Sequence, residues 1–304
     1  RLCDVQWRVR RLCKSYRADA CLSLGDVGPN NLPIPHVVLV QQYHLANISA
    51  AVERSWSWLN RIRFAYLRHH FRRMCRRGVE VIVQTPVMAN ALKEAFQISP
   101  QRLHVVPMAL PEHARPNTEI VHNPVIAESL KPCKLLFLAN LGPHKNAGIL
   151  ALVLERLTRR GLDSYVHVFL TADERAGAGV SELLEHLRPW QGMVTNLGLL
   201  PPPAVPGSLA ASSALFLPTL FESFGLVYLE ALATGTRILT SDRPFARWVC
   251  GETALYFDPL DPDAICDVIE GFAKGAATIS DFNAKAAKQL GKFPGSWTEV
   301  AERY

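Results

Sequence analysis

Short runs of aliphatic and β-branched residues alternate along the chain with longer segments in which apolar residues recur at helical spacing. In the first part of the chain the pattern predicts helices over about residues 50–77 and 87–97, and strands at residues 21–24, 36–40, 79–85 and 104–107. A second series predicts six strands, at residues 135–139, 165–170, 194–197, 214–217, 237–240 and 255–257. This alternation is typical of an α/β protein with parallel sheets.

The segment between the two series, residues 109–133, carries four prolines and little periodicity, which indicates a connection between domains. A chain of 304 residues is long enough for two cores, because domains usually hold about 100–200 residues. We therefore expect one α/β domain over residues 1–111 and a second over residues 112–279, followed by a C-terminal segment at residues 280–304.

The composition, with 49% hydrophobic and 20% charged residues, is that of a globular protein. No apolar run approaches the ~18 residues of a membrane-spanning helix, and the arginine-rich start does not have the pattern of a secretory signal. The seven cysteines show no CxxC spacing, so neither a disulfide framework nor a zinc site is indicated. We expect a cytoplasmic protein.

Positive charge is concentrated in the first quarter of the chain, where residues 1–80 hold 14 Lys and Arg against 5 Asp and Glu. Much of it lies in one predicted helix, in which an apolar stripe (Trp56, Leu59, Phe64, Leu67, Phe71, Met74) alternates with Arg61, Arg63, Arg68, Arg72, Arg73, Arg76 and Arg77. A cationic helix with an apolar stripe is attracted to an anionic membrane surface. The alternative is a helix whose aromatic residues pack inward and whose arginines face water. No groove-reading or RNA-binding motif accompanies the charge, so nucleic acid is not the expected partner.

Two segments carry candidate chemistry, because loops at the carboxyl ends of parallel strands bind ligands. The first is FLANLGPHKN, in which Lys145 lies just before a predicted helix, where a bound phosphate would be stabilised by the lysine and the helix amides. A surface lysine with its charge in water is the alternative.

The second segment is LFESFGLVYLEALATG, in which Glu222 lies in a turn after a strand and Glu230 lies inside the following helix. Helical geometry through the whole step would separate the two by roughly 12 Å, much of the length of a nucleotide diphosphate sugar. Gly235 suits the end of this helix. The alternative has Glu222 as an N-terminal cap and Glu230 as an exposed charge. Because Glu230 is flanked by apolar residues, however, we expect it to have a partner.

These motifs resemble those of family 4 retaining glycosyltransferases, which have the GT-B fold of two Rossmann-like domains. ESFGLVYLE is similar to the E-x7-E motif of that family, and the supporting matches are His144-Lys145-Asn146, Asn196-Leu197-Gly198 and Tyr256-Phe257-Asp258-Pro259-Leu260-Asp261. The resemblance covers residues 100–304 well and residues 36–107 loosely. It implies an acceptor-side first domain, a donor-binding second domain and a last helix, within residues 280–304, that crosses back to the first domain.

The resemblance also implies roles for single residues. Lys145 would neutralise the diphosphate and Glu222 would bind the donor sugar, both as catalytic residues, while Glu230 would bind the ribose. The phosphates would contact the backbone amides of Ser223, Phe224, Gly225 and Leu226, and the base would lie against the loop after Gly198. No metal or other cofactor is implied. The DPLDPD segment, with Asp258, Asp261 and Asp263, is interpreted as a turn that caps the next helix rather than as a metal site.

The chain departs from the family pattern at several positions. Asn140 stands at a donor-binding position where many members have an arginine, and Trp248 stands where a glutamate is usual. In the first domain, Gln42 and His44 follow a strand after which many members place a histidine, so they are the acceptor-side candidates. The first βα units of a GT-B protein have no counterpart here, so a fragment, or a partner chain that completes the first sheet, is expected.

Two functions fit the sequence. The first is a metal-independent, retaining transfer of a hexose from a nucleotide diphosphate sugar to a saccharide or lipid-linked acceptor in polysaccharide biosynthesis, by a protein peripheral to the membrane. The second is a non-catalytic homologue that binds a nucleotide sugar or a partner glycosyltransferase.

Overall fold

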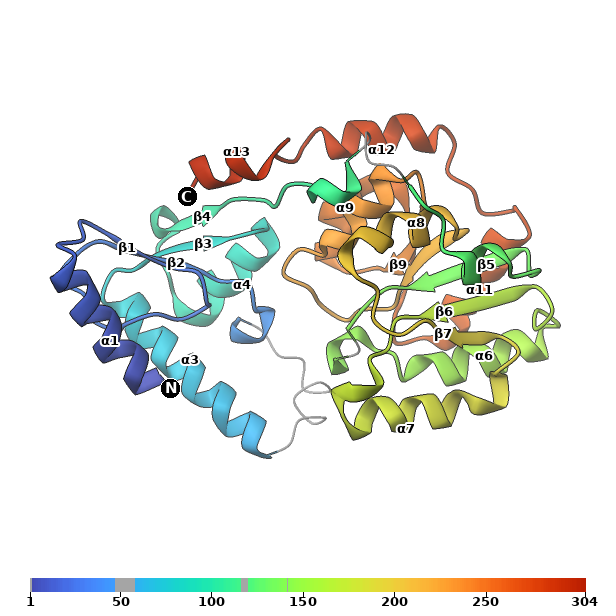
Figure 1. The fold of residues 1–304 in the computed structure, drawn as a ribbon, viewed down its shortest axis with the longest axis horizontal. Coiled ribbons are helices and arrows are strands. Elements are labelled where there is room, and N and C mark those ends of the chain that lie inside the picture. The colour runs from blue at the N-terminus through green and yellow to red at the C-terminus, as the bar shows by residue number, and fades with distance from the viewer. Residues whose placement is uncertain (1, 47–57, 116–119, 141) are drawn as a thin grey trace. The chain divides into compact units, whose positions relative to one another are not determined.

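The computed structural model describes residues 2–46, 58–115, 120–140 and 142–304 (Figure 1). The chain forms two compact units, which we describe separately. The first unit comprises residues 1–108 together with residues 222–224 and 298–304. The second comprises residues 109–221 and 225–297, so its main part begins close to the domain boundary expected from the sequence.

The first unit is a parallel sheet with helices, and its strand order is β1-β2-β3-β4. Its elements are α1 (Leu2–Ser15), β1 (Cys21–Ser23), β2 (His36–Leu39), η1 (Tyr43–Leu45), α3 (Trp58–Arg76), β3 (Glu80–Val83), α4 (Pro86–Phe96), η2 (Pro100–Arg102) and β4 (Leu103–Val105). All four predicted strands are present. Helix α1 was not predicted from the sequence, and the predicted helix over residues 50–77 begins, within the described residues, at Trp58.

The core of the first unit lies between its strands and the helices α3 and α4. Side chains from β2 and β3 pack there against Phe71 and Met74 of α3 and against Met88 and Leu92 of α4, and all of these are fully or almost fully buried. Local signals set the start of α4, because Thr85 accepts a hydrogen bond from the Met88 amide and Pro86, in the first turn, has no N–H that would need an acceptor.

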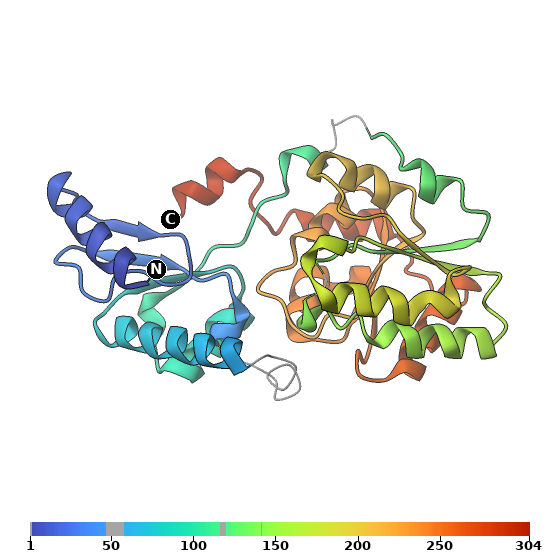
Figure 2. The same ribbon diagram turned by 60° about the horizontal axis from the view of Figure 1, so that its bottom comes forward.

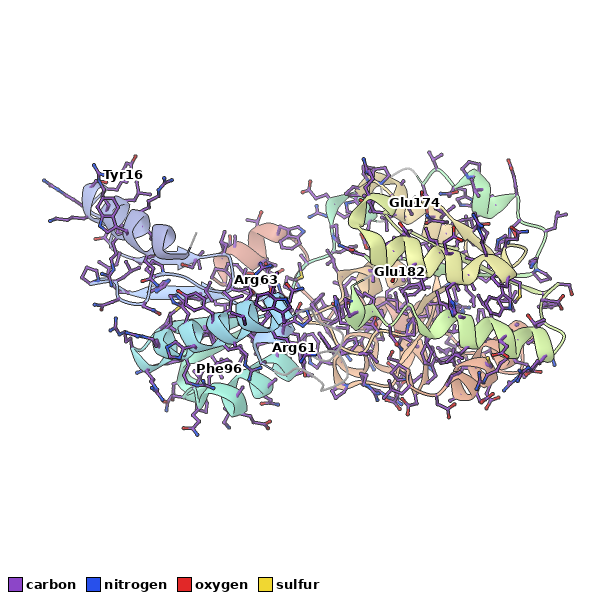
Figure 3. All side chains as sticks on the ribbon, turned by 90° about the horizontal axis from the view of Figure 1, so that it is seen from below. Tyr16, Arg61, Arg63, Phe96, Glu174 and Glu182 are labelled. Atoms are coloured by element: carbon purple, nitrogen blue, oxygen red, sulfur yellow. The ribbon has the colours of Figure 1, made fainter. Side chains whose placement is uncertain are left out.

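Only part of the predicted apolar stripe on α3 packs inward. Phe71 and Met74 are buried, and Phe64 and Leu67 are half-buried. Leu59 is 60% exposed, so the stripe does not pack inward at this position, and Trp56 lies outside the described residues. The first half of α3 instead exposes apolar and basic side chains together, and Figure 3 labels two of the arginines, Arg61 and Arg63.

The second unit is a six-stranded parallel sheet with the order β10-β9-β8-β5-β6-β7. Its strands are β5 (Cys133–Phe137), β6 (Val166–Leu170), β7 (Val194–Asn196), β8 (Ala214–Leu217), β9 (Arg237–Ser241) and β10 (Ala254–Phe257), which confirms all six predicted strands. Its α-helices are α5 (Pro124–Ala127), α6 (Ile149–Arg159), α7 (Ala178–Leu187), α8 (Val205–Ala210), α9 (Leu226–Ala233), α10 (Pro244–Cys250), α11 (Pro262–Ala273) and α12 (Phe282–Leu290). The last helix of the chain, α13 (Trp297–Glu302), has most of its residues in the first unit. The single-turn helices are η3 (Glu112–Ala114), η4 (Pro143–Lys145), η5 (Glu174–Ala176), η6 (Arg188–Trp190), η7 (Pro202–Ala204) and η8 (Gly251–Thr253).

The helices of the second unit cover its sheet, and the central strands β5, β6 and β8 are mostly apolar because both faces are buried. Figure 2 shows α6 and α7 side by side along the sheet. Ion pairs join α6 to α11, where Arg156 Nε lies 2.9 Å from Asp263 and Arg160 lies 2.7 Å from Asp267. Asp261 caps α11 by accepting from the amides of Asp263 and Ala264, as expected for the DPLDPD turn.

Two predicted segments contain more structure than expected. Residues 109–133, interpreted as a connection, carry η3 and α5 and belong to the second unit. Residues 280–304 form the two helices α12 and α13 rather than one. Among the described residues, no helix is both long and apolar enough to cross a membrane.

Candidate functional site

The order of strands in the second unit marks one position on the sheet for ligand binding. From β5 the chain proceeds outward to β6 and β7, whereas β8 lies on the other side of β5 and leads outward to β9 and β10. In open parallel sheets, ligands bind beyond the carboxyl ends of the strands where the order reverses in this way. Here that position lies between the loops that follow β5 and β8.

The loop after β5 carries Lys145. This half-buried lysine ends η4, and the next residue, Asn146, takes the left-handed conformation with φ of 59°. The Asn146 amide nitrogen Nδ2 donates to the Pro259 carbonyl oxygen at 2.7 Å, which fixes the loop against the turn before α11. Lys145 therefore lies on a loop with a defined backbone, four residues before the first residue of α6.

The loops after β5 and β8 contact each other directly. The Leu220 N–H donates to the His144 carbonyl oxygen at 2.8 Å, and the His144 ring stacks on Phe221 with 5.3 Å between centroids. Lys145 follows His144 in the chain, and Glu222 follows Phe221. The structure thus brings together the two loops that the sequence pattern indicated, although 77 positions separate Lys145 from Glu222.

The segment between Glu222 and Glu230 is only partly helical. Helix α9 begins at Leu226, and its N-cap is Gly225, whose φ of +86° lies in the left-handed region. The spacing of roughly 12 Å between Glu222 and Glu230 assumed helical geometry throughout. That assumption is wrong for residues 222–225, which precede the helix. The alternative in which Glu222 caps the helix is also wrong, because Gly225 occupies the cap. Gly235 follows the end of α9 with φ of +72°, as expected.

Helix α9 is held tightly in the core. Tyr228 is fully buried, and its hydroxyl lies 2.8 Å from Thr240 Oγ1 on β9, which itself donates to the Leu217 carbonyl of β8 at 3.1 Å. Gly225 has to be glycine for two reasons, since a Cβ there would lie 2.6 Å from the Tyr228 ring as well as being strained. The turn before α9 is therefore fixed by packing.

Glu230 has a partner that the sequence did not reveal. It is only 7% exposed, and its Oε1 lies 2.8 Å from His113 Nε2. Burial raises the pKa of the Glu230 carboxyl, and the hydrogen bond from His113 opposes that shift. The expectation that Glu230 would be paired is confirmed. His113 lies in the proline-rich segment taken for a connection, where no periodic pattern marked it.

The remaining donor-side candidates lie on neighbouring loops of the same sheet. Asn140 is exposed in the loop after β5, and its carbonyl oxygen accepts from the Gly142 amide at 2.8 Å. Gly198 follows β7 with φ of +70°, and its amide donates to Asn196 Oδ1 at 3.1 Å. Trp248 lies on α10 and packs edge-on against Phe293. Thr219, just after β8, has a buried hydroxyl without a hydrogen-bond partner among the described residues.

The acceptor-side candidates lie in the first unit, at the carboxyl end of β2. Gln42 lines a cavity of about 430 Å³ together with Asp26, Arg63 and Tyr66. Asp26 Oδ1 accepts from the amides of Gln41 and Gln42 at 2.7 and 2.8 Å, and burial raises its pKa. His44 packs edge-on against Phe64 instead, and burial lowers its pKa. Asp26 was not a sequence candidate.

Within the described part of the chain, no group of three or more His, Cys, Asp or Glu side chains is placed to hold a metal ion. The described residues near the switch of the second sheet include a lysine, Lys145, and a carboxylate, Glu230, beside the backbone amides at the start of α9. Such groups can bind a phosphorylated ligand with hydroxyls.

The fold defines the class of protein. Two α/β units with parallel sheets, and structural similarity to GT-B glycosyltransferases, confirm the predicted GT-B fold class. Sucrose-phosphate synthase from Thermosynechococcus elongatus has a similar structure, with a TM-score of 0.74 at 14% identity over 99% of this chain and 76% of that one. S. aureus TarM, in complex with UDP, has a TM-score of 0.65 at 12% identity over 90% of this chain and 51% of that one.

Sequence comparison finds similarity to glycosyltransferases, mainly in the second unit. Residues 132–274 match the model of the family "Glycosyl transferases group 1". A D-inositol 3-phosphate glycosyltransferase from Corynebacterium diphtheriae is 25% identical over 234 residues, which are 73% of this chain and 54% of the relative. The chain thus spans about half the length of this relative.

Proposed function

We propose that the protein is a retaining, metal-independent glycosyltransferase that moves a hexose from a nucleotide diphosphate sugar to a saccharide or lipid-linked acceptor. The observation that carries this proposal is the hydrogen bond between Leu220 and His144, which joins the loop of Lys145 to the segment entering Glu222 at the switch of the sheet. The match of residues 132–274 to the glycosyltransferase family model and the UDP bound in the structurally similar TarM support a nucleotide sugar as donor.

Each group of the site acts on one part of the donor. Lys145 and the amides of residues 223–226 bind the diphosphate, Glu222 binds the sugar, and Glu230 accepts from the ribose hydroxyls. Charge on the departing diphosphate grows as the glycosidic bond breaks, so a fixed lysine stabilises the transition state more than the bound donor. A lysine and helix amides supply this stabilisation without a metal ion.

The acceptor is proposed to bind at the first unit, with its hydroxyls at the cavity that Gln42 and Asp26 line. His44 has a weaker claim, because its ring packs against Phe64. The exposed apolar residues of α3 beside Arg61 and Arg63 support a peripheral contact with an anionic membrane, which would suit a lipid-linked acceptor.

The alternative is a homologue that binds the donor without turnover, and Asn140 favours it, because an arginine at that position would add a second positive charge for the diphosphate. Calorimetric titration with UDP-, GDP-, ADP- and dTDP-sugars tests donor binding, and release of nucleotide in the presence of membrane lipid extract tests transfer. Binding with release supports the enzyme, and binding without release supports the alternative. Absence of binding to all four donors contradicts both.

A further inference from the structure

The partner of Glu230 comes from a distant part of the same unit. His113 lies in η3, 117 positions before Glu230, and its Nε2 lies 2.8 Å from Oε1. An ionised carboxylate can only accept hydrogen bonds, so the imidazole donates through Nε2. The other oxygen, Oε2, accepts no hydrogen bond from the described residues. One side of the carboxylate is thus held and the other is left for a ligand.

The backbone of η3 holds the imidazole in position. Pro111 and Ala114 on either side of His113 are buried, and the Ala114 amide donates to the Pro111 carbonyl at 3.0 Å. The turn packs against α8 and η7, beside α9 (Figure 1). A histidine side chain has only two rotatable bonds, so a fixed backbone places Nε2 more closely than it would place a lysine or arginine.

No other charged group of the described residues compensates Glu230. The causes that shift its pKa are burial and His113 alone. Helix α8 carries no ionisable residue. The cations on the other elements that pack on α9 are Arg237, which lies over Phe282, Arg247, which pairs with Asp242, and the half-buried Lys285 and exposed Lys288 of α12. On η3 itself, Glu112 and Arg115 lie 3.9 Å from each other.

We propose that His113 is a positioning residue for nucleotide binding, which holds Glu230 ionised and turned so that Oε2 accepts the hydroxyls of a ribose. This inference rests on the proposed role of Glu230 as the ribose ligand. Because a buried carboxylate without a donor becomes protonated more readily, nucleotide affinity then depends on pH through a residue outside the E-x7-E segment.

The test measures the pKa of the Glu230 carboxyl by ¹³C NMR and the affinity for UDP by calorimetry, both between pH 5 and 8. In His113→Leu we expect the pKa of Glu230 to rise by about one to two units, as the loss of a nearby hydrogen-bonded donor produces. The pH at which UDP affinity halves should rise with it. His113→Gln keeps an N–H donor at a similar reach, so the pKa of Glu230 in this variant should lie close to the parent value.

The variants separate a positioning role from a structural one. The ionisation of UDP itself is common to all of them, so a difference between variants belongs to the protein. If His113→Leu does not fold, His113→Asn, whose donor is too short to reach Oε1, replaces it. A pKa of Glu230 that stays within about 0.3 units of the parent value in His113→Leu, or in His113→Asn where that variant replaces it, overturns the inference, because a lost donor should raise this pKa.

A second comparison tests the function on which the inference rests. Glu230→Gln removes the ionisable group and should weaken UDP binding while abolishing the pH dependence that Glu230 contributes. Should UDP bind Glu230→Gln as tightly as the parent at every pH, Glu230 is not the ribose ligand, and the proposed function of that residue fails even if the pKa responds to His113. Weaker binding in Glu230→Gln with no effect of His113 on the pKa overturns only the present inference.

Discussion

Replacing Gly225 with alanine is expected to destabilise the second unit more than any ordinary change at a helix start. Gly225 has φ of +86°, a region that costs a residue with a Cβ about 1–2 kcal/mol. The new Cβ would also lie 2.6 Å from Tyr228 Cε2 and 2.7 Å from Cδ2, closer than carbon atoms approach without a shift. Backbone and ring cannot both keep their positions.

The Tyr228 ring lies in the core of the second unit. It is fully buried, and its hydroxyl lies 2.8 Å from Thr240 Oγ1. Forcing extra volume into a packed core costs about 1–3 kcal/mol. Adding this to the backbone strain gives an expected loss of about 2–5 kcal/mol for Gly225→Ala.

Gly161→Ala is the matched control. Gly161 has φ of +70°, and a Cβ there would meet no atom within 4 Å. It should therefore cost only the backbone part, about 1–2 kcal/mol. The difference between the two variants measures the clash with Tyr228.

Native-state amide hydrogen exchange on β8 and β9 provides the assay, because it reports the opening free energy of the second unit even if the two units unfold separately. We expect Gly225→Ala to lower that free energy clearly more than Gly161→Ala does. Equal losses in the two variants, in correctly folded protein, would refute the argument from Tyr228 and show that the turn before α9 adapts to a side chain.

Four further predictions concern the proposed function. Glu230→Ala should weaken nucleotide-sugar affinity in calorimetry, since each charge-assisted hydrogen bond to the ribose contributes about 1.5–3 kcal/mol, and unchanged affinity would remove the ribose assignment. Lys145→Ala should lower kcat by about 10²-fold or more while the donor affinity stays nearly unchanged. The control Lys274→Ala, which loses only a surface ion pair with Glu270, should transfer at the parent rate. A parent rate for Lys145→Ala would refute the role of Lys145 in binding the phosphate. EDTA should leave transfer intact, and activity lost to the chelator and restored by magnesium would contradict a metal-independent reaction. Binding to vesicles should strengthen with the content of anionic lipid and weaken with salt, because charges are screened over ~10 Å at 0.1 M. Changing both Arg61 and Arg63 to Glu should weaken vesicle binding, whereas the control Arg175→Glu on the second unit should not. Salt-insensitive binding would refute a docking face on α3.

The sequence by itself determined the elements of this protein and the loops on which its candidate site lies. All ten strands of the described residues were predicted from short aliphatic or β-branched runs, which are most continuous in the strands buried on both faces, β5, β6 and β8. The left-handed Gly235 after α9 was also predicted from local pattern. The loops that carry Lys145 and Glu222 could also be predicted from local sequence, because each loop follows the end of a predicted strand. Helix α1 was not predicted, although Leu2, Val5, Val9 and Leu12 recur at helical spacing.

The tertiary structure alone decided which of these local features meet. The placement of β8 beside β5 is a pairing between strands some 80 residues apart, and it is this pairing that joins Leu220 to His144. The burial of Phe71 but not Leu59 on α3, and the choice of His113 as partner for Glu230, likewise depend on what packs against each side chain. Local periodicity records which face of an element is apolar, whereas long-range contacts follow from the packing of whole elements, so a buried carboxylate could be expected to have a partner but the partner could not be named.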